Sequence, residues 1–422
     1  MNVFAQYIKE PTESQVVNTK LLLLTMGLDV NFENLRRFHP DLKSQYKVNK
    51  VKVSDRHFIA PGTEQRDYIP DEIIITKNDQ RSVIKVYYSE GSPLMLSFNG
   101  KEFVIIDRKS GLTLPVNIDF VPLRKYAKNK IDGMPLDEFV STVGMDRVTI
   151  VPFDGCEHWL YGDQCKFCGA KPGRMKLSDF KPNVSEIKEN FDNSHKKWWE
   201  SHRDEVLGRI DKSLETFLYQ EEVKPHFHFM IISGNLLDMD LSWEIGLDIA
   251  KVVNNHVSLS TIDSHINLMP PRTITYVDNA KNLGFRSLDF NLETFGREMF
   301  EDVCPGKYKY CGYEQMLDAF RYGVRTFGKG NVRTNFVLGS EPIEKTISGA
   351  TYLAEIGVIP DYSVFFPRPG SVWHAKSPLS PDEILGFTKK LVNLYRDFDF
   401  RPFCCELSSR SSIANECYKG WV

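Results

Sequence analysis

The segment "RVTIVPFDGCEHWLYGDQCKFCGA" (residues 147–170) begins with an apolar run typical of a buried strand and ends in a loop with three cysteines. Eight residues separate Cys156 from Cys165, and two separate Cys165 from Cys168. Before this segment the chain holds short β-rich runs, and after it apolar runs alternate with helical stretches. The segment therefore opens a second domain, and its cysteines directly follow the first strand of that domain.

Six apolar runs after residue 146 predict strands, and the stretches between and after them predict helices. Apolar strands that alternate with helices form a parallel sheet covered on both faces. We therefore expect an α/β fold with six β/α units, curled into a barrel or part of one, whose chemistry lies at the C-terminal ends of the strands. The expected strands are 147–153, 227–233, 256–262, 286–292, 331–339 and 361–367, and the expected helices are 184–220, 241–254, 276–283, 313–327, 343–355 and 381–397.

Three regions differ along the chain. Residues 1–146 contain runs such as "DEIIITKND" (71–79) and "SVIKVYYSEG" (82–91), which predict a β-rich accessory domain. Residues 147–398 correspond to the barrel. Residues 399–422 form a short C-terminal extension that contains cysteines.

Composition narrows the possible partners. The chain has 422 residues and a formal net charge of −3 at pH 7, with both signs interspersed, so no nucleic-acid partner is expected. The apolar run at 20–28 is too short to cross a bilayer and no secretory signal is visible, so we expect a cytoplasmic protein without a membrane partner. Eight cysteines in such a chain indicate metal binding or catalysis rather than disulfides.

The three thiols of the loop allow three interpretations. A [4Fe–4S] cluster has four irons, so three cysteines hold it and leave one iron open. A structural zinc prefers four ligands, and the available fourth, His158, follows Cys156 by only two positions. Buried thiols without a metal are common, but a polar, glycine-containing loop argues against them. The cluster explains both the three cysteines and the missing fourth.

The loop resembles the cluster-binding loop of the radical S-adenosylmethionine (radical SAM) superfamily, in which an aromatic residue typically precedes the last cysteine, as Phe167 precedes Cys168. The superfamily commonly spaces its cysteines by three residues and then two, so this chain keeps the second gap and lengthens the first. The resemblance implies that Cys156, Cys165 and Cys168 bind a [4Fe–4S] cluster whose open iron binds S-adenosylmethionine. The reduced cluster then cleaves this cofactor to a 5′-deoxyadenosyl radical, which abstracts hydrogen from a substrate.

The resemblance also implies where the methionine part of the cofactor binds. Ser233, Gly234 and Asn235 follow the second strand, where the superfamily has a turn that contacts the methionine amino group. A glycine at that place lets the backbone approach a ligand closely. Arg297 follows Glu293 by one helical turn and is a candidate for the methionine carboxylate, although a surface arginine fits the same spacing.

The fourth expected strand contains "LDFNLET" (288–294), in which Asp289, Asn291 and Glu293 share one face. Three polar groups on an otherwise apolar strand are costly to bury without partners. The pattern is similar to that of the biotin-synthase-like subset, which implies that Asn291 and Glu293 hold the ribose hydroxyls. Asp289 is then a catalytic candidate on the substrate side. An internal polar network bound to ordered water is the alternative.

The fifth expected strand contains "VRTNFVLG" (332–339), in which alternate residues share one face. Family members often carry a glycine-containing motif here that lies against the adenine. By that resemblance Val337 and Gly339 contact the adenine, and Arg333 or Asn335 reaches inward as a catalytic candidate.

Five cysteines lie outside the loop. Cys304 and Cys311 flank a "PGKYKY" segment, and Cys404, Cys405 and Cys417 lie near the C-terminus. Some radical SAM enzymes bind a second cluster through C-terminal cysteines and use it as a sulfur source, which makes Cys404, Cys405 and Cys417 possible auxiliary ligands. Otherwise these cysteines are ordinary buried or surface thiols, one of which can serve as a hydrogen donor.

The sequence therefore predicts a radical SAM enzyme for a small-molecule or peptide substrate, served by an electron donor such as flavodoxin or ferredoxin. One alternative is a sulfur-inserting radical SAM enzyme with an auxiliary cluster, which predicts more than four irons per chain. The other is a zinc-stabilised binding protein, which predicts a colourless protein that does not cleave S-adenosylmethionine.

Overall fold

The chain folds into two compact units. The first comprises residues 1–123, 337–347 and 362–422, and the second comprises 124–336 and 348–361. The division into 1–146, 147–398 and 399–422 stays a prediction. The computed structural model describes residues 14–38, 52–54, 57–58, 70–121, 124–152, 156–169, 194–220, 227–368, 370–403, 407 and 409–422.

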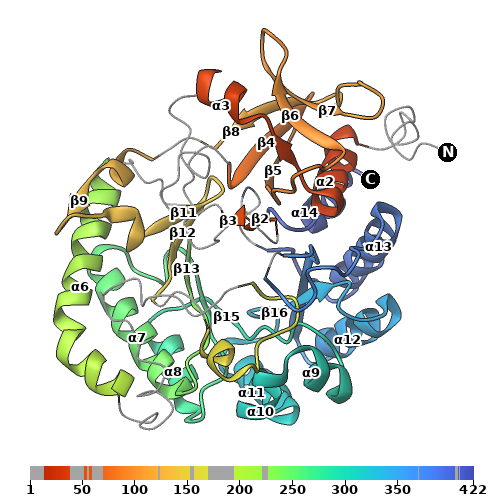
Figure 1. Cartoon of the computed structure of the whole chain (residues 1–422). Coiled ribbons are helices and arrows are strands. Elements are labelled where there is room, and N and C mark those ends of the chain that lie inside the picture. Colours follow the sequence, from red (N-terminus) through yellow and green to blue (C-terminus); the bar gives the residue numbers. More distant parts are fainter. Residues whose placement is uncertain are drawn as a thin grey trace. The chain divides into compact units, whose positions relative to one another are not determined.

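The main sheet has seven strands in the order β11-β12-β13-β14-β15-β16-β17 (Figure 1). β11 (Ser141–Val143) is antiparallel to β12 (Arg147–Ile150), and every neighbouring pair from β12 to β16 is parallel. The strands follow their order in the chain, as successive β-α-β crossovers produce. The expected α/β class is therefore confirmed. The remaining strands are β13 (His228–Ile232), β14 (Asp263–Asn267), β15 (Ser287–Asp289), β16 (Val332–Leu338) and β17 (Val358–Val364).

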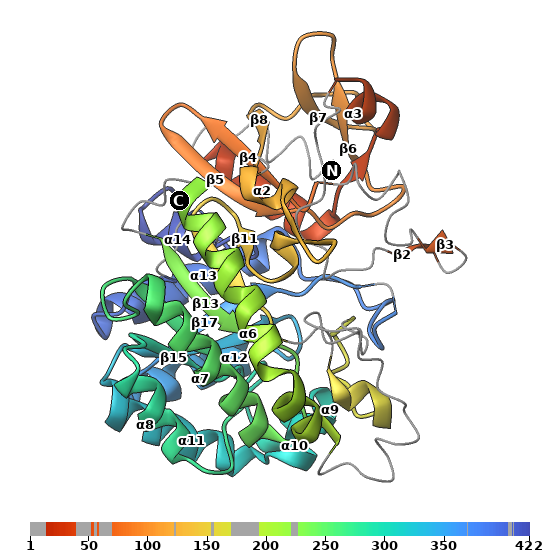
Figure 2. The same ribbon diagram turned by 90° about the vertical axis from the view of Figure 1, so that its left-hand side faces the viewer.

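Helices connect the parallel strands and cover them. Figure 1 shows α6 (Ser194–Gln220), α7 (Met239–His256) and α8 (Thr275–Asn282) along the outside of the sheet, and Figure 2 shows the same row from the front. This arrangement leaves the ends of the strands free to carry loops. The other helices of this region are α9 (Arg297–Val303), α10 (Pro305–Tyr310), α11 (Tyr313–Phe327) and α12 (Ile343–Glu355).

α11 illustrates how the sequence sets the packing. Its buried residues include Met316 and Phe320, four positions apart, so they lie on one face of the helix. Gly323 brings that face close to the sheet, because a Cβ there would lie 2.8 Å from Cδ2 of Leu288 in β15. An amphipathic pattern and one glycine thus fix the helix against the strand.

The third parallel strand lies further along the chain than the sequence pattern predicts. Residues 256–262, expected as a strand, form the end of α7 and a turn, and β14 follows at Asp263–Asn267. β14 reads "DSHIN" and is buried from Ser264 onward. A buried strand this polar lacks the apolar run by which a strand is recognised, so the prediction was wrong here.

The first unit combines a buried helix, two three-stranded sheets and the C-terminal elements. α2 (Gln15–Met26) is buried from Val16 to Thr25. α13 (Pro381–Asp397) begins at a capping box formed by Ser380 and Glu383. The sheets have the orders β1-β6-β7 and β5-β4-β8, with β1 (Asp29–Val30), β4 (Glu72–Lys77), β5 (Gln80–Lys85), β6 (Leu94–Phe98), β7 (Phe103–Asp107) and β8 (Asn117–Phe120).

Short elements complete the described residues. α14 (Ala414–Tyr418) is the last helix. The others are α3 (Phe32–Phe38), β2 (Lys52–Ser54), β3 (His57–Phe58), η1 (Lys125–Lys128), β9 (Lys130–Ile131), β10 (Met134–Pro135), η2 (Leu136–Glu138) and η3 (Glu157–Tyr161).

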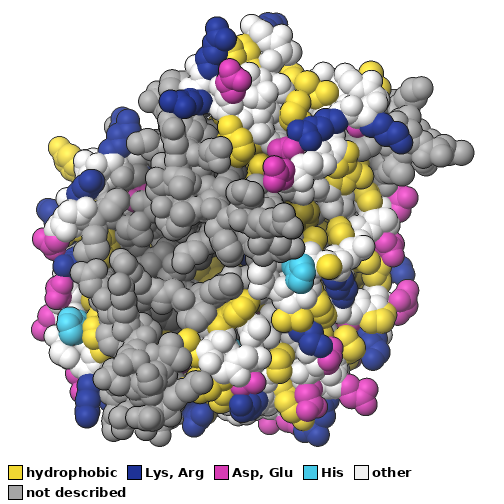
Figure 3. Space-filling model, viewed as in Figure 1, with side chains coloured by type: hydrophobic (Ala, Val, Ile, Leu, Met, Phe, Trp, Pro, Cys, Tyr) yellow, Lys and Arg dark blue, Asp and Glu magenta, His cyan; other side chains and the backbone are white. Residues whose placement is uncertain are grey.

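The described surface carries charges of both signs. Lys and Arg side chains and Asp and Glu side chains both appear on the face shown in Figure 3. Among the helices of the described residues, none has the length and apolar composition that crossing a bilayer requires.

Candidate functional site

The cysteine loop begins directly after β12. Cys156 has an extended backbone (φ −140°, ψ 128°) and precedes the 3-10 helix η3. The backbone N–H of Cys168 donates to the carbonyl of Cys165 (3.0 Å), so the last two cysteines lie on one tight turn. In open parallel sheets, the carboxyl ends of the strands are where ligands bind.

The thiol of Cys156 is influenced by the other two thiols of the loop. Burial raises the pKa of the Cys156 thiol to about 12, with further contributions from Cys165 and then Cys168. The backbone N–H of Asn235 donates to the Cys156 sulfur and opposes part of this rise in pKa. Within the described residues, no three His, Cys, Asp or Glu side chains are grouped as the ligands of one metal ion. Cysteine binds a metal as the thiolate, so the three thiols of this loop would release their protons on holding a metal cluster.

The turn after β13 is fastened to the cysteine loop. The backbone N–H of Glu157 donates to the carbonyl of Asn235 (2.9 Å), and the Glu157 carboxylate accepts from the N–H of Leu237 (2.7 Å). Within the turn, the hydroxyl of Ser233 donates to the carbonyl of Gly234 (2.8 Å). The structure therefore brings the expected methionine-binding turn beside the cluster cysteines.

Glu157 also ties the loop to α6. Its Oε1 lies 3.2 Å from Nε2 of His195, and both side chains are buried. Burial raises the pKa of Glu157 to about 7, and the N–H of Leu237 opposes part of that rise. The sequence analysis missed Glu157, because an acid beside a loop cysteine has no signal that distinguishes it from a surface residue.

A fourth thiol lies beside the loop. Cys304 follows α9, is fully buried, and shares a hydrogen bond with Cys165. The backbone N–H of Lys166 donates to the carbonyl of Val303 (2.9 Å), which holds the two segments together. Nothing in the spacing of the cysteines indicates this approach, because Cys165 and Cys304 are far apart in the chain and only the fold joins them.

α10 packs directly against the cysteine loop. The backbone N–H of Gly306 donates to the carbonyl of Asp163 (2.8 Å), and Tyr310 stacks on the ring of His158 with centroids 5.5 Å apart. A Cβ on Gly306 would lie 2.5 Å from both the Asp163 oxygen and the His158 ring. Only glycine therefore allows so close an approach.

Lys307 brings a positive charge into this region. The residue is 5% exposed, and its Nζ donates to Oε1 of Glu293 (2.8 Å) and to the carbonyl of Asn291 (2.6 Å). Burial alone would lower the pKa of Lys307, but Glu293 and the thiols of Cys165 and Cys304 raise this pKa above its ordinary value. The expected ribose carboxylate is thus paired with a lysine that the sequence analysis did not consider, since a lysine between Gly306 and Tyr308 gives no sign of burial.

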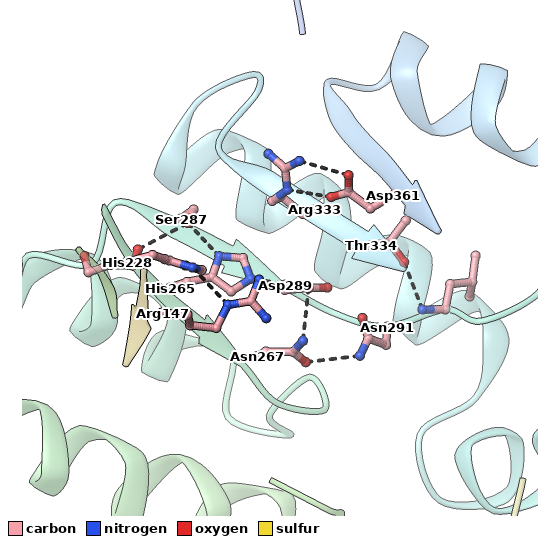
Figure 4. A network of polar contacts seen from close by, with 12 residues as sticks. Arg147, His228, His265, Asn267, Ser287, Asp289, Asn291, Arg333, Thr334 and Asp361 are labelled. Carbon is pink, nitrogen blue, oxygen red and sulfur yellow. Dashed lines mark hydrogen bonds and ion pairs between the residues drawn. The ribbon is translucent and has the colours of Figure 1, made fainter. Parts of the chain in front are cut away.

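Asp289 and Asn291 belong to a buried polar network on β14 and β15 (Figure 4). Oδ2 of Asp289 accepts from Nδ2 of Asn267 (3.1 Å) and lies 3.3 Å from Nε2 of His265. Nδ2 of Asn291 donates to Oδ1 of Asn267 (3.3 Å). Within the described residues, Oδ1 of Asp289 and Oδ1 of Asn291 are buried without a hydrogen-bond partner. Two buried acceptors therefore remain for a donor.

The fifth-strand candidates lie on β16. Arg333 is 6% exposed and donates to Asp361 through Nε (2.6 Å) and Nη2 (3.0 Å), so its charge is neutralised on the neighbouring strand (Figure 4). The carbonyl of Asn335 accepts from the backbone N–H of Glu293 (2.9 Å). The strand that carries Asn335 thereby fixes the backbone of Glu293, which has a positive φ of 70°.

Four further residues are expected to contact the cofactor. Phe167 is half-buried in the cysteine loop, and Arg297 is exposed at the start of α9. Val337 and Gly339 belong to the first unit, in which Gly339 has a φ of 101°. Their roles stay predictions.

The expected auxiliary cysteines are described only in part. Cys417 is 4% exposed and lies in α14 of the first unit. Cys404 and Cys405 lie outside the described residues. The auxiliary cluster therefore stays a prediction.

The sequence is similar to a characterised protein. No protein-family profile matches the chain. The bacteriochlorophyllide c C-7(1)-hydroxylase of Chlorobaculum limnaeum is 23% identical over 281 residues, which are 64% of this chain and 65% of the hydroxylase. The chain thus spans less than two thirds of the length of this relative.

Three solved structures are similar to the chain. HydG, a maturase of the [FeFe]-hydrogenase, has 16% identity and a TM-score of 0.37, over 60% of this chain and 50% of HydG. The coproporphyrinogen III oxidase HemN of Escherichia coli, a radical SAM enzyme, has 11% identity and a TM-score of 0.38, over 65% and 57%. A radical SAM methyltransferase from Sphaerobacter thermophilus has 11% identity and a TM-score of 0.39, over 82% and 81%. Two of these three proteins are named as radical SAM enzymes.

Proposed function

We propose that the chain is a radical SAM enzyme built on a partial (β/α)6 barrel. Cys156, Cys165 and Cys168 hold the [4Fe–4S] cluster. With S-adenosylmethionine on its open iron, the reduced cluster supplies a 5′-deoxyadenosyl radical, which abstracts hydrogen from a small-molecule or peptide substrate. The observation that supports this proposal best is that the three thiols of the loop lie beside the turn after β13, with a hydrogen bond from Asn235 to Cys156.

The residues that position the cofactor come from successive strand ends. Ser233, Gly234 and Asn235 receive the methionine amino group, because their turn is hydrogen-bonded to the cysteine loop. Asn291 and Glu293 accept hydrogen bonds from the ribose hydroxyls. Arg297 is the candidate for binding the methionine carboxylate. Phe167 is the aromatic residue expected beside the cluster. Val337 and Gly339 are the candidates for contact with the adenine.

The substrate side of the site is the polar network around Asp289. Its Oδ1 is a buried acceptor without a partner in the described residues, so a donor group of the substrate would satisfy it. Arg333 and Asn335 complete this side. Since Asp361 neutralises Arg333, we expect the pair to orient a polar substrate rather than to bind an anion.

The relative in Chlorobaculum limnaeum is named a hydroxylase of bacteriochlorophyllide c. For this chain the substrate class stays a small molecule or a peptide. We further propose a cytoplasmic enzyme served by a low-potential donor such as flavodoxin or ferredoxin, without a nucleic-acid or membrane partner.

The proposal is tested by anaerobic reconstitution with iron and sulfide. We expect about four irons per chain and, after addition of dithionite and S-adenosylmethionine, formation of 5′-deoxyadenosine. Both should be lost in Cys165→Ala. Zinc in place of iron, with no nucleoside formed, would contradict the proposal. About eight irons would favour the sulfur-inserting alternative, with Cys404, Cys405 and Cys417 as auxiliary ligands.

One observation favours a second candidate, a closed four-thiol site. Cys304 is hydrogen-bonded to Cys165, and four thiolates suit a structural zinc or a cluster without an open iron. Such a site would stabilise a binding protein. Replacing Cys304 by Ala separates the two candidates, because an open-iron enzyme keeps its iron and its 5′-deoxyadenosine formation, whereas a four-thiol site loses its metal.

A further inference from the structure

Lys307 is a fully buried cation between two parts of the proposed site. On one side its Nζ donates to Glu293, the expected ribose carboxylate, at 2.8 Å. On the other side, the thiols of Cys165 and Cys304 are near enough to favour its charged form. The side chain therefore lies where the cysteine loop and the nucleoside-binding strand end meet.

The hydrogen bonds of Lys307 are incomplete within the described residues. An ammonium group has three donors. The described acceptors of Lys307 are two, Oε1 of Glu293 and the carbonyl of Asn291 at 2.6 Å. One donor thus remains in a buried region that also holds the thiols of Cys165 and Cys304, which become negatively charged when a metal replaces their protons. This is the arrangement expected of a cation that faces a negatively charged group absent from the protein chain.

The backbone around Glu293 limits where its carboxylate can point. Its φ of 70° lies in the left-handed region that a glutamate rarely adopts, and its N–H donates to the carbonyl of Asn335 (2.9 Å). With the backbone held by β16, the ion pair with Lys307 fixes the remaining side-chain orientation. The position of the carboxylate therefore depends on Lys307.

We infer that Lys307 is a positioning residue that holds the ribose-binding carboxylate of Glu293 and places a fixed positive charge beside the cluster thiolates. This inference rests on the proposed function. It assigns to one side chain two effects, on the affinity for the nucleoside part of the cofactor and on the ease with which the cluster accepts an electron from its donor.

The direction of the redox effect follows from charge. Reduction adds one negative charge to a cluster already held by thiolates, and a buried cation stabilises the reduced state more than the oxidised state. Removing the cation should therefore make the reduction potential more negative. Removing the neighbouring carboxylate should do the opposite, because it takes away a negative charge at the same place.

The effect on affinity follows from the ion pair. Without Lys307, Glu293 loses the cation that lies 2.8 Å from its Oε1. A carboxylate that this cation no longer holds in place is a poorer acceptor for ribose hydroxyls. We expect S-adenosylhomocysteine to bind at least tenfold more weakly to Lys307→Met than to the wild type.

The experiment compares four variants of the reconstituted holoprotein. Lys307→Met removes the charge with little change in volume, Lys307→Arg keeps the charge, and Glu293→Gln removes the opposing charge. Lys309→Met is the matched control, since Lys309 lies on the same short helix and forms an exposed pair with Asp163. The readouts are iron content, the midpoint potential from a redox titration followed by EPR, and calorimetric binding of S-adenosylhomocysteine.

We expect a more negative potential in Lys307→Met, a less negative potential in Glu293→Gln, and values close to wild type in Lys307→Arg and Lys309→Met. A merely structural role would move Lys307→Met and Glu293→Gln in the same direction, and this outcome would overturn the inference. If Lys307→Met does not retain iron, the inference is tested by the midpoint potential of Glu293→Gln alone. A less negative potential supports the inference, and a more negative potential overturns it. A wild type without a cluster would contradict the proposed function itself, whereas a wild type with a cluster and four unshifted variants would contradict only the role of Lys307.

Discussion

In each unit of the protein, a buried lysine among the described residues is paired with a glutamate. In the first unit, Lys20 lies 2.7 Å from Glu416, and in the second unit, Lys307 lies 2.8 Å from Glu293. Burying a charge is costly unless the charge is paired and hydrogen-bonded, so each pair needs an explanation. The distances are nearly the same, but the surroundings differ.

Lys20 has a complete set of acceptors in the first unit. Its Nζ donates to Ser82 (3.1 Å), to the carbonyl of Ser409 (2.8 Å) and to Glu416 (2.7 Å). Burial lowers the pKa of Lys20, and Glu416 only partly opposes this. All three donors are used, so the pair joins α2 to β5 and the C-terminal segment, and its role is structural.

Lys307 has fewer acceptors among the described residues and more negative charge around it. Its pKa is raised despite burial, because the thiols of Cys165 and Cys304 act together with Glu293. The comparison shows that a buried ion pair alone does not indicate function. A buried cation with an unused donor among the described residues, next to cysteines that we propose as metal ligands, is a stronger indication.

The largest expected effect is at the thiols themselves. Cys165→Ala should lose the reconstituted iron completely, because two cysteines do not hold a [4Fe–4S] cluster. It also removes one of the negative groups that surround Lys307. Iron analysis and visible absorption measure the loss, with Cys311→Ala, a buried thiol outside the loop, as the control that keeps its iron. Retention of four irons in Cys165→Ala would contradict the ligand assignment.

Replacing Lys20 by Met sharpens the comparison from the structural side. The change leaves Glu416 buried without its cation, which should cost about 3–5 kcal/mol of the free energy of unfolding. The cluster potential should stay that of the wild type. Urea denaturation and redox titration measure the two quantities, and Lys419→Met, at an exposed position of the same segment, should cost less than about 0.5 kcal/mol. A shifted cluster potential in Lys20→Met would contradict the claim that the Lys20–Glu416 pair is only structural.

Gly306→Ala tests whether close packing of α10 sets the position of Lys307. Its new Cβ would lie 2.5 Å from the Asp163 oxygen and the His158 ring, so the helix must move, at a cost of about 1–3 kcal/mol. We also expect lower iron retention. Gly386→Ala is the matched control, since that glycine lies in α13 with nothing near its Cβ position, and alanine there should be neutral or stabilising. Equal stability of the two variants would contradict the close packing.

A partly exposed pair should show the smallest effect. Asp248 accepts from Nε of Arg203 (2.7 Å) and from Lys251 (2.9 Å); burial alone would raise the pKa of Asp248, but these partners lower it overall. The stabilisation is present above the unfolded pKa of about 4 and is lost as the pH falls through the lower folded pKa.

Asp248→Asn should therefore cost about 1 kcal/mol at pH 7 and nothing measurable at low pH. Thermal or urea unfolding at several pH values checks this slope. Asp204→Asn, at a fully exposed acid on the same helix as Arg203, should show no pH-dependent difference. A cost of Asp248→Asn that persists in acid would contradict the ionic origin of the effect.

Features that depend on the pattern within a single strand or loop could be predicted from the sequence. The apolar runs predicted five of the six strands from β12 to β17 closely, because burial on both faces selects apolar residues. The cysteine spacing predicted the loop after β12. β14 was missed since its buried residues, His265 and Asn267 among them, are polar and belong to the network that also holds Asp289.

Contacts between distant segments could not be predicted from the sequence. Cys304, Gly306 and Lys307 belong to a short stretch that looks like a surface loop in the sequence, and only the fold brings it against the cysteine loop. Strand alternation indicated Glu293 as a candidate. Its partner Lys307 could not be predicted, because only the fold brings the two residues together. Local patterns report burial, whereas the pairing of buried charges depends on tertiary structure.

The central claim is that three cysteines leave one iron open for S-adenosylmethionine. The most direct measurement is the EPR spectrum of the dithionite-reduced, reconstituted protein before and after addition of S-adenosylmethionine. The account predicts that the signal changes on addition, in the wild type and in Cys304→Ala alike. An unchanged signal from an intact cluster would contradict it and would indicate that a fourth protein ligand closes the site.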